Sequence, residues 1–308
     1  MSFRDTAGGD AFLPEDEAAV ALLTLEVRRV VEGFLGGRHA ALHRGASVEF
    51  AEYTRYFPGD DLRHLDWKAL ARSDKMYVKA REREVVLNSL LLLDASPSMN
   101  YAGSRAEKSK FAYARLLLGA VGQILLRQGD AVGLLAFADG PDVYLAPRQH
   151  PRHMAALFGQ MAAVHPQETG HTNYAQAFVF AAEQLRQRSM VVVASDLWSM
   201  TEADEVALAS LSARGHDVVV FHVLSPDEID LPHRSAALFR DMETGRAVFS
   251  DPALVREDYR RAVQREIARI DGVFGRAQID VVHAVSNVPP QRVLSELKSR
   301  RASARVVS

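Results

Sequence analysis

The stretch NSLLLLDASPSM, residues 88–99, joins an apolar run to a polar ending. A short run of leucines bounded by polar residues is typical of a strand that is buried on both faces of a sheet. Polar residues that directly follow such a strand can cap a turn, or they can bring ligands to the edge of the sheet. Asp94, Ser96 and Ser98 stand at alternate positions there, so a turning loop can aim all three side chains inward.

Outward from this stretch, apolar runs alternate with segments of helical periodicity. Further strands are predicted at AVGLLAF, MVVVAS, DVVVFHVL and QIDVVHA. The run DVYLA follows AVGLLAF too closely for a helical crossover, so we expect it to pair antiparallel at an edge of the sheet. Ser104 with Glu107, and Thr201 with Asp204, have the spacing of capping boxes that open helices. The alternation predicts a doubly wound α/β fold, a mainly parallel sheet with helices on both faces.

The chain before residue 88 has a different character. Between Glu15 and Leu35, apolar residues recur at helical spacing, which predicts an N-terminal amphipathic helix that ends at Gly36 and Gly37. The segment 38–83 is highly charged and predicted to be extended or irregular. We therefore expect an N-terminal part, residues 1–88, packed on a main α/β domain, residues 89–308.

The composition argues against several classes of protein. The 37 Lys and Arg residues nearly balance the 39 Asp and Glu residues, so no overall basic field indicates a nucleic-acid partner. The absence of cysteine removes disulfides and thiolate chemistry. The first residues lack the pattern of a secretory signal, and the longest apolar stretch, residues 116–126, is shorter than the roughly 20 residues of a membrane span. We expect a cytoplasmic protein without a membrane span.

Three segments place hard oxygen ligands where the predicted strands end or a helix begins. They are DASPSM, GHTNYAQAF and ASDLW, and they supply Asp94, Ser96, Ser98, Thr172 and Asp196. Carboxylates and hydroxyls without sulfur or imidazole suit Mg²⁺ or Mn²⁺. In doubly wound sheets, ligands bind beyond the carboxyl ends of the strands. For each segment alone, a cap or a turn is the better explanation, but the joint appearance of the three segments favours a metal site.

These residues resemble the metal-ion-dependent adhesion site of von Willebrand factor type A domains, with the trio D-x-S-x-S, a threonine in HTN and an aspartate in SD. The resemblance implies that Ser96, Ser98 and Thr172 contact the metal directly. It also implies that Asp94 and Asp196 act through coordinated water. A carboxylate from a partner protein would then complete the metal's coordination shell.

The segment 43–72, HRGASVEFAEYTRYFPGDDLRHLDWKALAR, is similar to the signature of a bacterial family, the domain of unknown function 58, in which such a box precedes a type A domain. The resemblance runs from about Gly36 to the final arginines and includes FRDMETG at residues 239–245. Such proteins are commonly encoded beside MoxR-type AAA+ ATPases. The resemblance therefore implies a non-enzymatic, metal-dependent adaptor or co-chaperone that works with such an ATPase.

The charged box from Pro58 to Arg72 leaves two interpretations open. The Pro58-Gly59 turn fixes adjacent carboxylates, which nearby arginines can pair through two hydrogen bonds each. This is either a salt-bridged clamp that docks the N-terminal segment on the sheet or a surface that faces a partner.

An alternative function is a metal-dependent nuclease or phosphohydrolase. Asp60, Asp61, Asp66 and Lys68 have the residue types that surround Mg²⁺ in such enzymes. The sequence contains no nucleophile elbow, phosphate-binding loop or HExxH zinc motif. We expect no catalytic activity and keep the nuclease as the alternative.

Overall fold

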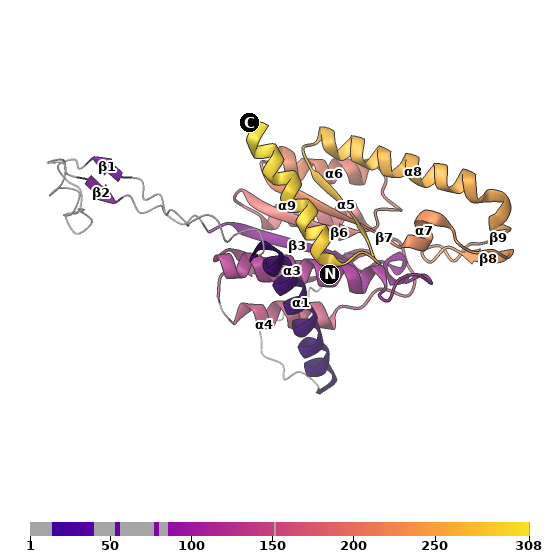
Figure 1. Ribbon diagram of the computed structural model, residues 1–308, viewed down its shortest axis with the longest axis horizontal. Helices are drawn as coiled ribbons and strands as arrows, with labels where there is room; N and C mark the ends of the chain where they lie inside the picture. Colours follow the sequence, from indigo (N-terminus) through magenta and orange to yellow (C-terminus); the bar gives the residue numbers. More distant parts are fainter. Residues whose placement is uncertain (1–13, 40–52, 56–76, 80–85, 151, 308) are drawn as a thin grey trace. The chain divides into compact units, whose positions relative to one another are not determined.

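A six-stranded sheet forms the centre of the computed structural model, which describes residues 14–39, 53–55, 77–79, 86–150 and 152–307 (Figure 1). The strands of this sheet, in chain order, are β3 (Asn88–Asp94), β4 (Ala131–Ala138), β5 (Gly140–Arg148), β6 (Ser189–Ser195), β7 (Asp217–Leu224) and β10 (Asp280–Val285). They lie in the order β10-β7-β6-β3-β4-β5. Neighbouring strands are parallel, except that β5 runs antiparallel to β4 at the edge.

Counted along the chain, this strand order is the 3-2-1-4-5-6 order of a doubly wound sheet. The predicted fold class is therefore confirmed, and so is the antiparallel edge strand that begins just after β4.

The central strand β3 packs apolar side chains on both of its faces. Leu91 and Leu93 point into one layer, and Leu90 and Leu92 point into the other. The first layer is covered by α3 (Lys110–Gln128), α4 (His153–Ala163) and α9 (Pro290–Val307). The second is covered by α5 (Tyr174–Gln184), α6 (Glu202–Ala213) and α8 (Pro252–Arg276). Within the described ranges, every helix is too short or too polar to serve as a membrane span.

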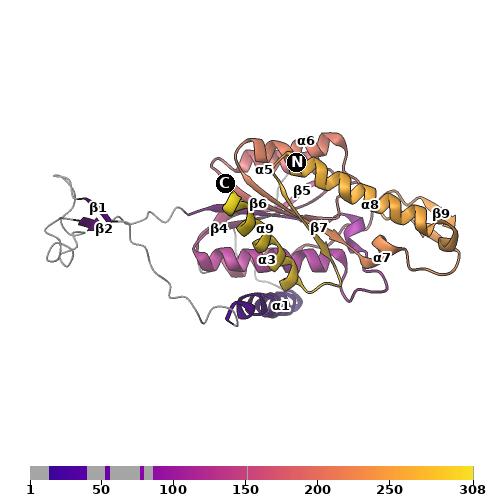
Figure 2. The ribbon, with the colours of Figure 1, turned by 45° about the horizontal axis from the view of Figure 1, so that its top comes forward.

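The N-terminal helix α1 (Pro14–His39) packs outside α3 (Figure 2). Its side chains Leu23, Val27 and Val31 are buried in the same apolar layer as α3. A Cβ atom built on Gly119 of α3 would lie only 2.8 Å from Cγ2 of Val27, so the two helices approach closely there. The predicted amphipathic helix is confirmed, although it continues past Gly36.

The chain divides into two units, residues 1–37 together with 87–308, and residues 38–86. The helix α1 thus belongs with the α/β domain, whereas the predicted boundary at residue 88 grouped it with the charged segment. In the smaller unit, β1 (Tyr53–Arg55) pairs antiparallel with β2 (Tyr77–Lys79). Asp60, Asp61, Asp66 and Lys68 lie outside the described residues, so both interpretations of the charged box stay predictions.

Two local features differ from the sequence prediction. The helix α3 begins at Lys110 with Ser109 as its cap, and the predicted capping box of Ser104 with Glu107 is wrong. Ser104 instead donates to the carboxylate of Asp227 in the short helix α7 (Pro226–Asp230). The second difference is a hairpin that was not predicted, formed by the antiparallel strands β8 (Ala237–Arg240) and β9 (Ala247–Ser250). The predicted capping box of α6, from Thr201 with Asp204, is present.

Candidate functional site

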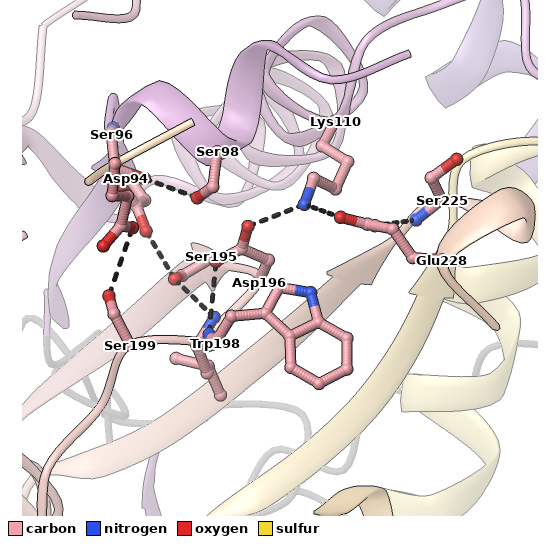
Figure 3. A network of polar contacts seen from close by, with 12 residues as sticks. Asp94, Ser96, Ser98, Lys110, Ser195, Asp196, Trp198, Ser199, Ser225 and Glu228 are labelled. Carbon is pink, nitrogen blue, oxygen red and sulfur yellow. Dashed lines mark hydrogen bonds and ion pairs between the residues drawn. The ribbon is translucent and has the colours of Figure 1, made fainter. Parts of the chain in front are cut away.

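The candidate site lies beyond the carboxyl ends of β3 and β6, which are neighbours in the sheet. They are the first and fourth strands of the 3-2-1-4-5-6 order, between which the winding direction reverses, and such a point is where doubly wound sheets bind ligands. β3 ends at Asp94 and leads into the short helix η2 (Pro97–Asn100), while β6 is followed directly by Asp196. Figure 3 shows side chains from both strand ends gathered around one region.

Asp94 organises the loop that follows β3. Its side chain is fully buried, and its Oδ1 atom accepts the backbone N–H of Ser96 at 2.8 Å. The Oδ2 atom accepts the hydroxyls of Ser195 at 2.5 Å and Tyr174 at 3.3 Å. Burial, followed by repulsion from Asp196, raises the pKa of Asp94 to about 7. These donors hold the carboxylate in a fixed orientation. The hydrogen bond from the backbone of Ser96 in turn fixes the loop.

The two serines of the loop present their hydroxyls side by side. The Oγ atoms of Ser96 and Ser98 lie 3.2 Å apart, and Ser96 is fully buried while Ser98 is partly exposed. Around an octahedral Mg²⁺ ion with ligand distances of about 2.1 Å, adjacent ligand oxygens are about 3.0 Å apart. The spacing of the two hydroxyls therefore suits neighbouring ligand positions.

Thr172 lies just before α5, whose cap is the side chain of Asn173. Its hydroxyl donates to Oε1 of Glu243 at 3.2 Å, and the hydroxyl of Ser199 donates to the same oxygen at 3.2 Å. Glu243 belongs to the turn between β8 and β9. Burial, together with repulsion from Asp196, raises the pKa of Glu243. The third predicted hydroxyl ligand thus lies beside a carboxylate to which sequence analysis assigned no role.

Asp196 forms an ion pair with a buried lysine, as Figure 3 shows. The Nζ atom of Lys110 lies 2.7 Å from Oδ2 of Asp196 and 2.5 Å from Oε1 of Glu228. Burial alone would lower the pKa of Lys110, but attraction to the two carboxylates outweighs it and the pKa is raised. The sequence signal for Lys110 was a lysine directly before Phe111, at the start of a largely apolar helix.

The carboxylate and hydroxyl oxygens of the candidate site are the kind of ligand that a hard divalent cation prefers. The structure brings Asp94, Ser96, Ser98 and Asp196 to one edge of the sheet. Within the described ranges, no group of three or more His, Asp or Glu residues is placed to hold a metal ion, so a cation here would depend on the hydroxyl oxygens. It would also share the carboxylate of Asp196 with Lys110.

A cavity of about 390 Å³ opens beside the site. It extends from the two strand ends to α7, α8 and the β8–β9 hairpin, and its lining includes Ser98, Trp198, Ser199, Glu228, Glu243 and Tyr259. Its volume lies at the lower end of the range of small-molecule pockets, which begins at roughly 300 Å³. The cavity is large enough to admit side chains of another protein.

Comparison with known proteins identifies the family. The model of the family described as "Protein of unknown function DUF58" matches residues 52–269. "Uncharacterized protein Rv1480" of Mycobacterium tuberculosis (strain ATCC 25618 / H37Rv) is 30% identical over 260 residues, which cover 82% of this chain and 80% of the relative.

Among solved structures, the chain is similar to the conserved hypothetical protein BatB from Bacteroides thetaiotaomicron, with a TM-score of 0.47 and 18% sequence identity. The similarity covers 70% of this chain and 99% of that one. Another such structure is the SpRpn10 VWA domain, with a TM-score of 0.43 and 12% identity over 69% of this chain and 95% of that one. The chain belongs to the DUF58 family of proteins of unknown function, and its main domain is a doubly wound α/β sheet.

Proposed function

We propose that this protein is a non-enzymatic adaptor that holds Mg²⁺ or Mn²⁺ and uses the cation to bind an acidic side chain of another protein. The observation that carries the proposal is the pair of hydroxyls of Ser96 and Ser98, 3.2 Å apart and fixed by Asp94 where the sheet reverses its winding. Hydroxyl oxygens in this position are suitable ligands for a hard cation.

The way the carboxylates are held supports binding over catalysis. Asp94 is held by three donors, and Asp196 and Glu228 share the ammonium group of Lys110. A general base needs to reach a substrate proton, whereas these groups are engaged with the protein itself. Such carboxylates are suited to holding the loop and the strand ends in position. This favours binding of a ligand by the hydroxyls of Ser96 and Ser98.

For the partner, we propose a MoxR-type AAA+ ATPase that presents the acidic side chain, with the protein acting as its adaptor or co-chaperone in the cytoplasm. The support is the similarity of the charged box to DUF58 proteins, which are commonly encoded beside such ATPases. The nuclease alternative depends on Asp66 and its neighbours, and Mg²⁺-dependent cleavage of nucleic acid that is lost in Asp66→Ala would favour it instead.

The double variant Ser96→Ala/Ser98→Ala tests the proposal, because it removes two hydroxyls and leaves the carboxylate of Asp94 in place. We expect it to lose Mn²⁺ binding, followed by electron paramagnetic resonance, and to lose Mg²⁺-dependent capture of a purified MoxR-type ATPase. Ser235→Ala, at an exposed serine that does not line the cavity, is the control and should behave as the wild type. Capture that persists in the double variant or in the presence of a chelator would overturn the proposal.

A further inference from the structure

We infer that Glu243 is an acidic ligand supplied by the chain itself, and that its carboxylate occupies the position that a partner's acidic side chain takes in the proposed function. The β8–β9 hairpin then keeps the site closed until a partner displaces it. The inference rests on the proposed function and adds a regulatory element to the same site.

The Glu243 carboxylate lies one ligand spacing from a predicted metal ligand. Its Oε1 atom lies 3.2 Å from the hydroxyl of Thr172 and 3.2 Å from the hydroxyl of Ser199. Thr172 is one of the three hydroxyls predicted to contact the metal. Since adjacent ligands of Mg²⁺ are about 3.0 Å apart, Oε1 lies one ligand spacing from Thr172. This is the separation expected of a further oxygen in the same coordination shell.

The turn that carries Glu243 is held by hydrogen bonds of its own. The Oδ1 atom of Asp241 accepts the backbone N–H of Glu243 at 2.8 Å and that of Thr244 at 3.3 Å. Its Oδ2 atom accepts the hydroxyl of Thr244 at 2.8 Å. Gly245, with a φ of 70°, supplies the left-handed residue that lets the chain return into β9. An aspartate that hydrogen-bonds the backbone two residues later is a recognised turn-former, so the turn holds Glu243 in place.

The charge of Glu243 is not balanced by a cationic side chain among the described donors to its Oε1 atom. Glu243 is only partly exposed and lies near Asp196, so the two carboxylates repel each other. The donors to Oε1 of Glu243 are two neutral hydroxyls, which are weaker partners than a cation. A divalent cation between the carboxylates of Glu243 and Asp196 would offset their repulsion. The turn already holds Glu243 in the orientation that such a cation would require.

The hairpin also has the features of an element that can be displaced. It forms its own two-stranded sheet and is not paired with the central sheet. An isolated two-stranded hairpin is only marginally stable. Leu238, Val248 and Phe249 are 62%, 64% and 71% exposed, so the hairpin offers a partner an apolar contact next to the site. Displacing it would therefore disturb little of the core.

The test is Mn²⁺ affinity of the full chain, with Glu243→Ala compared with Glu257→Ala, which makes the same charge change at an exposed position on α8. We expect Glu243→Ala to bind Mn²⁺ about tenfold more weakly, the size of effect typical when a supporting group of a metal site is lost. Acetate should then tighten Mn²⁺ binding by Glu243→Ala, because it replaces the missing carboxylate. Acetate should change neither the wild type nor Glu257→Ala.

The outcomes separate this inference from the proposed function. If the wild type binds Mn²⁺ through Ser96 and Ser98, but Glu243→Ala binds it equally well or does not respond to acetate, only the role of Glu243 is overturned. If the wild type shows no binding that depends on the serines, the metal site itself fails and the inference fails with it. Should Glu243→Ala unfold, Glu243→Gln keeps the shape and hydrogen bonds of the side chain, and it should show the same loss of affinity.

Discussion

Lys110 places an ammonium group beside the candidate site, between the carboxylates of Asp196 and Glu228. The side chains of Lys110 and Asp196 are fully buried, so neither charge is screened by water. Removing one partner of a buried pair leaves the other charge uncompensated, which is far more costly than losing an exposed pair. Lys110 is therefore as much a part of the site as the predicted ligands.

We predict that Lys110→Met lowers the free energy of unfolding by about 3–5 kcal/mol, because Asp196 stays buried without its cation. The control is Lys108→Met, which breaks a pair with Glu26 whose side chains are both partly exposed. That pair should contribute about 0–1 kcal/mol. Urea unfolding of the two variants measures the difference, and equal losses would show that the Lys110 pair is not buried as described.

Among the individual residues, the sequence predicted those at the strand ends. It did not predict Lys110 and Glu243, which reach the site from α3 and from the β8–β9 turn. Asp94 and Asp196 could be placed together because adjacent parallel strands end at the same edge of a sheet. Lys110 reaches Asp196 across 86 positions of the chain, and Glu243 reaches Thr172 across 71. Such contacts depend on how α3 and the hairpin pack, so no local pattern in the sequence pairs Lys110 with Asp196 or Glu243 with Thr172.

At the scale of elements, the four inner strands of the central sheet, β3, β4, β6 and β7, were predictable because they are buried on both faces and consist of apolar runs. The hairpin strands β8 and β9 are four residues each and mostly exposed, so they carry no comparable pattern. The wrong capping box at Ser104 has a similar cause. Its partner, Asp227, lies 123 positions away, and this tertiary hydrogen bond replaces the local one.

The contact between α1 and α3 gives a prediction at this scale. Gly119→Ala would push a methyl group against Val27, while Val27→Ala removes the methyls that it meets. We therefore expect Gly119→Ala to be better tolerated in the Val27→Ala background, by about 1–2 kcal/mol of coupling energy in a double-mutant cycle of urea unfolding.

The matched control for this cycle pairs Gly119→Ala with Leu22→Ala, since Leu22 is an exposed residue of α1. Its effect should add to that of Gly119→Ala without coupling. Additive behaviour in both cycles would contradict the packing of α1 on α3.

At the scale of the whole molecule, the chain itself stabilises the end of the sheet where the candidate site lies. The three donors to Asp94 and the ammonium group of Lys110 satisfy the buried carboxylates at the end of the sheet. Proteins whose metal sites form only with the metal unfold when it is removed. Here the donors that fix Asp94 and the ammonium group that pairs with Asp196 both come from the chain itself.

We predict that a chelator leaves the thermal unfolding midpoint of the wild type unchanged, and that added Mg²⁺ raises stability by mass action, by about 2.7 kcal/mol at one hundred times the dissociation constant. Differential scanning calorimetry with and without Mg²⁺ measures both effects. The variant Ser96→Ala/Ser98→Ala should show no rise. Unfolding of the wild type by a chelator would mean that the metal is part of the structural core.

The lysine beside the site has one more consequence, which concerns timing. Because Lys110 supplies a permanent positive charge next to Asp196, a newly made chain can finish folding before it meets any metal ion. Under the proposed function, loading of the cation is then a separate and reversible event, and its binding and release would require no refolding of the chain.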